Sequence, residues 1–174
     1  NQDQFDGPII HPQKWPQDLD YKNKKVVIIG SGATAVTIVP AMADQVDHIT
    51  MLQRSPTYFM AAPDKDMIGN FLKKIFRQKT AYFLTRWKNI LMGNFFYNQC
   101  VKNPEKVKEM LINGVKDHLG EDYDIDTHFT PKYKPWDERL CFVPNADLFE
   151  AMKAGKASVV TDHIDEFTET GIKL

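Results

Sequence analysis

Cysteine is scarce in the 174-residue sequence, and the two cysteines, Cys100 and Cys141, lie far apart. Neither belongs to a C-x-x-C pair, which excludes a redox dithiol motif and a cysteine-based zinc site. The five histidines are scattered, with no H-x-x-x-H pair among them. We therefore expect no metal site, and we expect reduced thiols in the core of a cytoplasmic protein.

Long apolar runs and excess charge are also absent. No stretch approaches the roughly 20 apolar residues of a membrane-spanning helix, and no signal peptide is present. The formal net charge is −1, so no global attraction recruits nucleic acid. The length suffices for one domain with a full core. Because the chain starts at Asn1 and its motifs begin almost at once, we interpret it as a piece of a longer protein.

The most informative stretch begins with a short apolar run from Val26 to Ile29, which predicts a buried parallel strand. A G-x-G-x-x-A turn follows directly, formed by Gly30, Ser31, Gly32, Ala33, Thr34 and Ala35. Such a turn brings the backbone and the free amides of the next helix close to a pyrophosphate. The turn alone is weak evidence, but a second strand at His48–Gln53 completes a βαβ unit.

The residues after this second strand indicate which dinucleotide is bound. NAD-binding domains usually place an acid here to accept hydrogen bonds from the ribose 2′-hydroxyl. This sequence has Arg54 and Ser55 instead. Arginine offers a planar, permanently charged group that suits a 2′-phosphate. We therefore predict that the ligand is NADPH, held by the glycine turn and by these two side chains.

The rest of the chain predicts further elements. Pro40 falls within the helix after the turn and should kink or shorten it. Gly120–Pro135 looks irregular, Ala157–Val160 predicts another strand of the parallel sheet, and a hairpin follows, with strands at residues 163–168 and 171–174. We expect an α/β fold with a linker at residues 1–23 and a Rossmann-like, NADPH-binding domain at residues 24–174. A helical insertion is expected at about residues 64–120.

This insertion combines apolar residues at helical spacing with a basic face. Two or three amphipathic helices are predicted between Met67 and Lys102, and another from Pro104 to about His118. No acid occurs between Asp66 and Glu105. Three interpretations fit the basic and aromatic residues: a solvated positive face over an aromatic core, contact with an anionic membrane surface, or single-stranded nucleic acid. Helical periodicity favours the first two, so we expect no nucleic acid and leave open a peripheral membrane association.

The linker carries a more specific pattern. Its prolines forbid a regular helix, and on the residues alone a proline-rich connector anchored by Phe and Trp would be preferred. It nevertheless matches F-x-G-x-x-x-H-x-x-x-W-P through Phe5, Gly7, His11, Trp15 and Pro16. Together with the glycine turn, the Q-R-S-P that follows the second strand and the tract WDERLCFVPNADLFEAM, the sequence resembles the class B flavoprotein monooxygenases, closest to the Baeyer–Villiger group.

The resemblance covers essentially the whole chain and implies a function. It corresponds to the fingerprint and most of the NADPH domain of an FAD-dependent enzyme that inserts one oxygen atom into small lipophilic ketones or oxidises sulfides. FAD would be bound mainly by another domain of the same parent chain, so the isolated piece is expected to be inactive. Arg139 resembles the family's active-site arginine, which stabilises negative charge at the flavin and positions the nicotinamide.

Some features leave alternatives open. By spacing alone, Arg139 would be a surface arginine paired with Asp137 or Glu138. Many relatives have a lysine where this chain has Glu138, which predicts weaker binding or selectivity for NADPH unless Lys132 or Lys134 compensates. The alternative functions are a domain of an NADPH-dependent flavin disulfide reductase, and a helical module that docks on a membrane or partner. The first should show a redox cysteine pair or depend on one elsewhere in the protein, and none is visible in this sequence.

Overall fold

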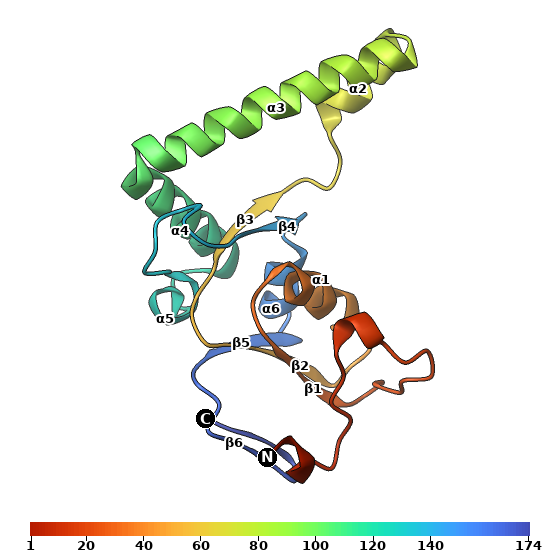
Figure 1. The fold of residues 1–174 in the computed structure, drawn as a ribbon, viewed down its shortest axis with the longest axis vertical. Helices are drawn as coiled ribbons and strands as arrows, with labels where there is room; N and C mark the ends of the chain where they lie inside the picture. The colour runs from red at the N-terminus through yellow and green to blue at the C-terminus, as the bar shows by residue number, and fades with distance from the viewer.

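The βαβ unit forms the centre of the fold. The structure is a computed structural model that describes residues 1–174. A parallel sheet has the order β1-β2-β5 (Figure 1), and its strands are β1 (Lys25–Ile29), β2 (His48–Gln53) and β5 (Ala157–Thr161). The helix α1 (Ala33–Met42) connects β1 to β2. The predicted α/β class, the predicted bounds of β2 and the parallel pairing of β5 are all confirmed.

A second parallel pair joins two distant segments, β3 (Tyr58–Ala62) and β4 (Leu140–Pro144). β3 was not predicted from the sequence, because its pairing partner lies about 80 residues further along the chain. Between the two strands lie α2 (Met67–Ile75), α3 (Gln78–Lys102), α4 (Pro104–Leu119) and α5 (Ile125–Phe129). The first three confirm the predicted helices. The short α5 corrects the expectation that Gly120–Pro135 is irregular throughout.

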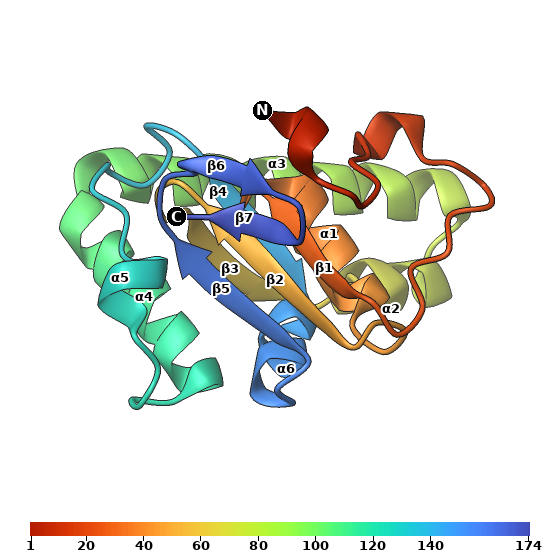
Figure 2. The ribbon, with the colours of Figure 1, turned by 90° about the horizontal axis from the view of Figure 1, so that it is seen from below.

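The chain ends near its beginning. After α6 (Asp147–Lys153) and β5, the strands β6 (Glu166–Thr168) and β7 (Gly171–Lys173) form the predicted antiparallel hairpin, although its first strand is shorter than expected. The short 3-10 turn at Gln2–Gln4 lies beside this hairpin (Figure 2). The amide of Asp6 donates to the carbonyl of Glu169 at 3.1 Å. The linker therefore runs over the surface, between the hairpin and β1.

The main core lies between the three-stranded sheet, the helices α1 and α6, and the β3-β4 pair. Side chains from all of them form one buried cluster. Phe59, Phe129 and Phe149 meet edge to face at its centre, with ring centroids 5.6 to 6.3 Å apart. Such aromatic pairs add roughly 0.5–1.5 kcal/mol beyond their burial. Cys141 belongs to this cluster and Cys100 to a smaller one, and both thiols are free and buried, as predicted.

The expected burial of β1 is wrong. Its side chains alternate, so Val26 and Ile28 are half-buried against the core while Val27 and Ile29 are exposed. β1 is an edge strand of the sheet, and Val27 and Ile29 lie on the face opposite to the one that packs on the main core. Pro40 stays inside α1, which ends two residues later at Met42. The proline therefore coincides with the end of a short helix. None of the helices is both long and apolar enough to cross a membrane.

Asp66 stabilises the start of α2 through two hydrogen bonds to its carboxylate. Its carboxylate accepts from the amide of Gly69 at 2.8 Å and from the ammonium of Lys88 on α3 at 2.6 Å. These bonds, the Lys88 bond first, hold the pKa of Asp66 below its usual value. Asp66→Ala removes a helix cap and an ion pair, and should lower the free energy of unfolding by about 1 kcal/mol.

The effect should depend on pH. Because the pKa of Asp66 is lower in the folded protein, its contribution is present above the unfolded pKa of about 3.9 and is lost as the pH falls through the folded value. Urea unfolding followed by circular dichroism at about pH 7 and about pH 2.5 measures it. The matched control Asp64→Ala removes a nearby carboxylate that forms no ion pair. An equal loss for Asp66→Ala at both pH values would contradict the prediction.

Candidate functional site

A pocket lies at the carboxyl ends of β1, β2 and β5. Ligands of open parallel sheets normally bind at this edge. The cavity has a volume of about 410 Å³. The residues that line it are Ile29, Gly30, Ser31, Leu52, Gln53, Arg54, Ser55, Arg139, Asp162, His163 and Ile164. Five predicted site residues therefore meet in one pocket: Gly30, Ser31, Arg54, Ser55 and Arg139.

Hydrogen bonds to neighbouring segments hold the glycine turn beside this pocket. Gly30 has a φ of +119°, which strongly favours glycine, and its amide donates to the carbonyl of Leu52 at 2.7 Å. Ser31 is buried, and its hydroxyl lies 3.0 Å from that of Thr57. The thiol of Cys141 donates to the carbonyl of Ser31 at 3.8 Å. Because the Ser31 hydroxyl is bonded within the protein, Ser31 can offer a ligand mainly its backbone amide.

The backbone around Gly32, at the start of α1, has room for a phosphate. Gly32 precedes α1 with a φ of −80°, a conformation that any residue adopts. A Cβ atom added there would meet nothing within 4 Å. The protein itself therefore does not require glycine at this position, whereas close approach of a ligand would. No side chain caps α1, and Ala33 and Thr34 are exposed in its first turn. The amides of that turn have no partner within the helix, so the turn fits a pyrophosphate.

Arg54 follows β2 directly and is positioned by its buried neighbour. The side-chain amide of Gln53 donates to the carbonyl of His128 at 2.7 Å and to the hydroxyl of Thr161 at 2.9 Å. These bonds join the end of β2 to α5 and β5. Arg54 itself is exposed and forms no ion pair within 4 Å. Its guanidinium is therefore available to an anion in the pocket.

Arg139 reaches the same pocket from the start of β4. The hydroxyl of Tyr133 donates to the carbonyl of Arg139 at 2.8 Å, and the hydroxyl of Tyr58 donates to the carbonyl of Tyr133 at 2.7 Å. Burial raises the pKa of Tyr58 to about 12, which keeps this donor protonated. Arg139 is paired neither with Asp137 nor with Glu138. Glu138, Lys132 and Lys134 do not line the pocket.

The other predicted residues lie outside the pocket. Gly32, Ala33 and Thr34 are adjacent to it at the start of α1. The fingerprint residues lie in the linker. The ring of Phe5 covers Gly7 so closely that a Cβ atom there would come within 2.5 Å of it. The imidazole of His11 accepts from the amide of Gln13, and Trp15 lies edge-on to Tyr21, one residue before Pro16.

Six lining residues were not predicted as site residues: Ile29, Leu52 and Gln53 belong to β1 and β2, and the other three are Asp162, His163 and Ile164. These last three follow β5, and the amide of Asp162 donates to the carbonyl of Gln53 at 3.0 Å. A signal was available, because β5 was predicted as a parallel strand and the carboxyl ends of such strands share one edge. Asp162 brings a carboxylate into the pocket, and that carboxylate accepts from the amide of His163 at 2.7 Å.

Known proteins resemble this chain along nearly its whole length. No protein-family model matches. The FAD-containing monooxygenase EthA of Mycobacterium tuberculosis is 53% identical over 171 residues, which are 98% of this chain and 35% of that protein. The probable FAD-binding monooxygenase AlmA of Acinetobacter baylyi is 50% identical, over 100% of this chain and 35% of AlmA. The chain thus spans about a third of the length of these relatives.

Solved structures that share the fold of this chain are also monooxygenases. An oxidised steroid monooxygenase bound to NADP matches with a TM-score of 0.70 and 20% identity, covering 98% of this chain and 40% of that one. Cyclohexanone monooxygenase from Rhodococcus sp. Phi1 bound to NADP⁺ matches with a TM-score of 0.66 and 18% identity, covering 98% and 39%. The chain is therefore a homologue of one segment of the FAD-containing monooxygenases, and it shares the fold of the corresponding part of the steroid and cyclohexanone monooxygenases.

Proposed function

We propose that this chain is the NADPH-binding part of an FAD-dependent monooxygenase. The observation that carries the proposal is the position of Arg54, which is unpaired and lines one pocket with the glycine turn and Arg139. The relatives at about 50% identity are named FAD-containing or FAD-binding monooxygenases, which supports the same assignment. We also propose the domain division predicted from the sequence, with a linker at residues 1–23 and an NADPH-binding domain at residues 24–174.

Different residues of this chain would bind different parts of NADPH. The amides of Ser31 to Thr34 would bind the pyrophosphate, and Gly30 would shape the turn, because its own amide is bonded to Leu52. Arg54 and Ser55 would bind the 2′-phosphate. Since the Ser31 hydroxyl is bonded to Thr57, Ser31 takes part through its backbone. The carboxylate of Asp162 opposes any anion in this pocket. Arg54 and Arg139 together outweigh this single charge, so the pocket as a whole favours a phosphate.

Arg139 would act where negative charge develops. When bound, FAD supplies the transfer of electrons from NADPH to molecular oxygen. The task of Arg139 is to keep a permanent positive charge at a fixed place beside the nicotinamide end of the cofactor. The hydrogen bond from Tyr133 to its carbonyl holds its backbone in position. A preorganised cation costs no reorganisation when charge appears, which makes such a residue effective.

FAD and the substrate require residues beyond the described ones. The chain has a single G-x-G-x-x-A turn, which we assign to NADPH. We therefore propose that FAD binds mainly to another domain of the same protein and that these 174 residues alone do not turn over. The proposed substrates are small lipophilic ketones, which give esters, and sulfides, which give sulfoxides. A disulfide reductase is disfavoured because Cys100 and Cys141 are buried in separate clusters.

Isotope labelling tests the reaction type. The full-length enzyme, supplied with FAD, NADPH and ¹⁸O₂, should convert an aliphatic methyl ketone to an ester that carries one labelled oxygen atom. The second oxygen atom should leave as water, with one NADPH consumed for each ester. Mass spectrometry of the product measures the label. If NADPH is consumed only when a disulfide substrate is added, or if the label enters only from H₂¹⁸O, the proposal is wrong.

A further inference from the structure

The helices α2 and α3 form an arm, defined as residues 67–102, that extends beside the α/β body (Figure 1). The arm packs mainly on itself. In α2 only Gly69 is buried, and in α3 only Ala81 and Cys100. Gly69 lets the two helices approach so closely that an added Cβ atom would lie 3.0 Å from Thr85. At its far end, Cys100 anchors α3 to the body in a small cluster that includes Tyr58.

The remaining surface of the arm is strongly apolar. Phe83, Trp87 and Leu91 recur every four residues on one side of α3, with 58%, 48% and 63% of their surface exposed. The rings of Phe83 and Trp87 meet edge to face, with centroids 6.2 Å apart. We call these three residues the α3 stripe. Further large apolar residues exposed on the arm include Met67, Phe71, Ile75, Tyr82, Met92 and Phe95. So large an apolar patch marks a surface that the rest of the same protein, a partner or a membrane covers.

The charge of the arm has a single sign. No acid occurs between Asp66 and Glu105. The arm and its connecting turn carry Lys73, Lys74, Arg77, Lys79, Arg86, Lys88 and Lys102. Lys88 alone among them forms an ion pair, with Asp66. The net charge of the whole chain is nevertheless −1, so the positive charge is concentrated here.

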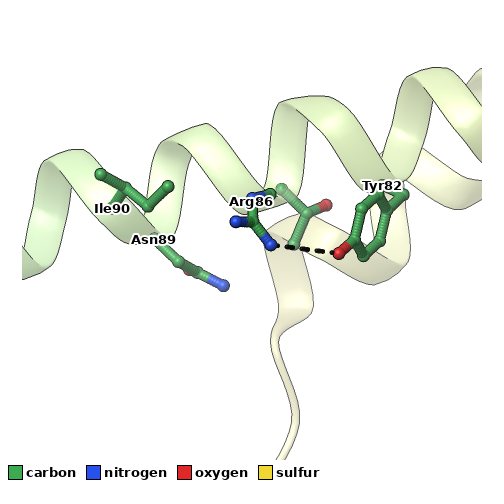
Figure 3. A pocket seen from close by; sticks show the side chains of 5 residues that line it. Tyr82, Arg86, Asn89 and Ile90 are labelled. Carbon is green, nitrogen blue, oxygen red and sulfur yellow. Dashed lines mark hydrogen bonds between the residues drawn. The ribbon is translucent and has the colours of Figure 1, made fainter.

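The close view of α3 shows how cations and aromatic residues share the surface (Figure 3). The guanidinium of Arg86 donates to the hydroxyl of Tyr82 at 3.3 Å, with Asn89 and Ile90 further along the helix. All residues that line this hollow belong to α3. The hollow is therefore a groove along one helix, and it does not enclose a small ligand as typical binding pockets do.

The apolar side chains alone would fit several partners, including the rest of the same protein, but the acid-free positive charge favours an anionic one. A second copy of the chain would bring two acid-free, positively charged arms together, which is electrostatically unfavourable. An anionic lipid surface complements both properties, because headgroups attract Lys and Arg while the acyl boundary takes up exposed aromatic and aliphatic side chains. No helix here crosses a membrane, so contact would be at the interface. We propose that the arm docks the protein on the surface of a membrane that contains anionic lipids.

Vesicle flotation with the full-length protein tests the proposal. Vesicles of phosphatidylcholine with about 30% phosphatidylglycerol should carry the protein upward, whereas pure phosphatidylcholine should not, and salt at about 0.5 M should release it. The triple variant Lys73→Gln, Lys74→Gln, Arg77→Gln should bind at least about tenfold more weakly. Replacing the α3 stripe with glutamine should also reduce binding, and circular dichroism should show unchanged helix content.

A matched control removes the same charge elsewhere. Lys106, Lys108 and Lys116 lie on α4 and form no ion pairs. Replacing these three lysines with glutamine should change the affinity for anionic vesicles by no more than about twofold, which reflects the lower net charge alone. Equal binding to neutral and anionic vesicles, or no binding to either, would overturn the proposal. The proposal would also be overturned if the protein forms a dimer in gel filtration, the α3 stripe variant is a monomer, and neither binds vesicles.

Discussion

Arg139→Ala in the full-length enzyme should abolish most oxygenated product while leaving the reduction of bound flavin by NADPH largely intact. The reduction mainly requires that the two rings be held together. The proposed oxygen-dependent chemistry would develop negative charge, and a cation aimed at such charge in a water-excluded site is worth about 3–4 kcal/mol, or some hundreds-fold in rate. Arg139 lines the same pocket as the glycine turn and has no acidic partner to neutralise it.

Two assays measured together distinguish this role from a structural one. Ester or sulfoxide formation should fall several hundredfold, and hydrogen peroxide should account for the NADPH that is still consumed. The matched control is Arg77→Ala, which removes an exposed arginine outside the pocket and should not change the ratio of product to peroxide. If Arg139→Ala keeps its normal product yield, Arg139 is an ordinary surface residue and the catalytic part of the proposal is wrong.

Arg54→Ala should weaken the binding of NADPH by about 10- to 100-fold and barely change the binding of NADH. The range follows from losing one charge-assisted hydrogen bond to a phosphate, which typically costs about 1.5–3 kcal/mol. Arg54 is free of ion pairs, so its loss should not leave a buried acid behind. Only NADPH carries the 2′-phosphate, and only its affinity should respond.

Titration of both cofactors by calorimetry measures the effect. Arg54→Lys should recover part of the affinity, because lysine keeps the charge but lacks the planar, bidentate geometry. Arg77→Ala again provides the control. An equal loss for NADPH and NADH in Arg54→Ala would show that the substitution disturbs the pocket as a whole, and the 2′-phosphate assignment would fail.

Local patterns were sufficient for the centre of the fold. The apolar run before Gly30, the glycine turn and His48–Gln53 each lie within a few residues of their partners, and β2 has the predicted bounds. The β3-β4 pair depends on contacts between Tyr58–Ala62 and Leu140–Pro144, which no local pattern reports. The exposure of Val27 and Ile29 was equally hidden, because it depends on which elements cover the sheet.

The site could be predicted in part for the same reason. Gly30 and Arg54 follow consecutive strands, so their meeting is a consequence of parallel topology. Arg139 was identified by resemblance alone. Its position in the pocket depends on the bond from Tyr133, which no spacing rule reveals. His163 and Ile164 could have been placed at the cavity by the same rule, because they follow the predicted parallel strand β5. Periodicity likewise predicted the helices of the arm without showing that their apolar side chains are uncovered.

A crystal structure of the full-length protein with NADP⁺ tests the central claim most directly. It locates the 2′-phosphate and the pyrophosphate relative to named atoms of this chain. We predict hydrogen-bond distances of about 2.7–3.2 Å between the 2′-phosphate and the Arg54 guanidinium, with the pyrophosphate at the amides of residues 31–34. A 2′-phosphate that lies in solvent or on other residues, with the glycine turn empty of phosphate, would contradict the assignment of this pocket to NADPH.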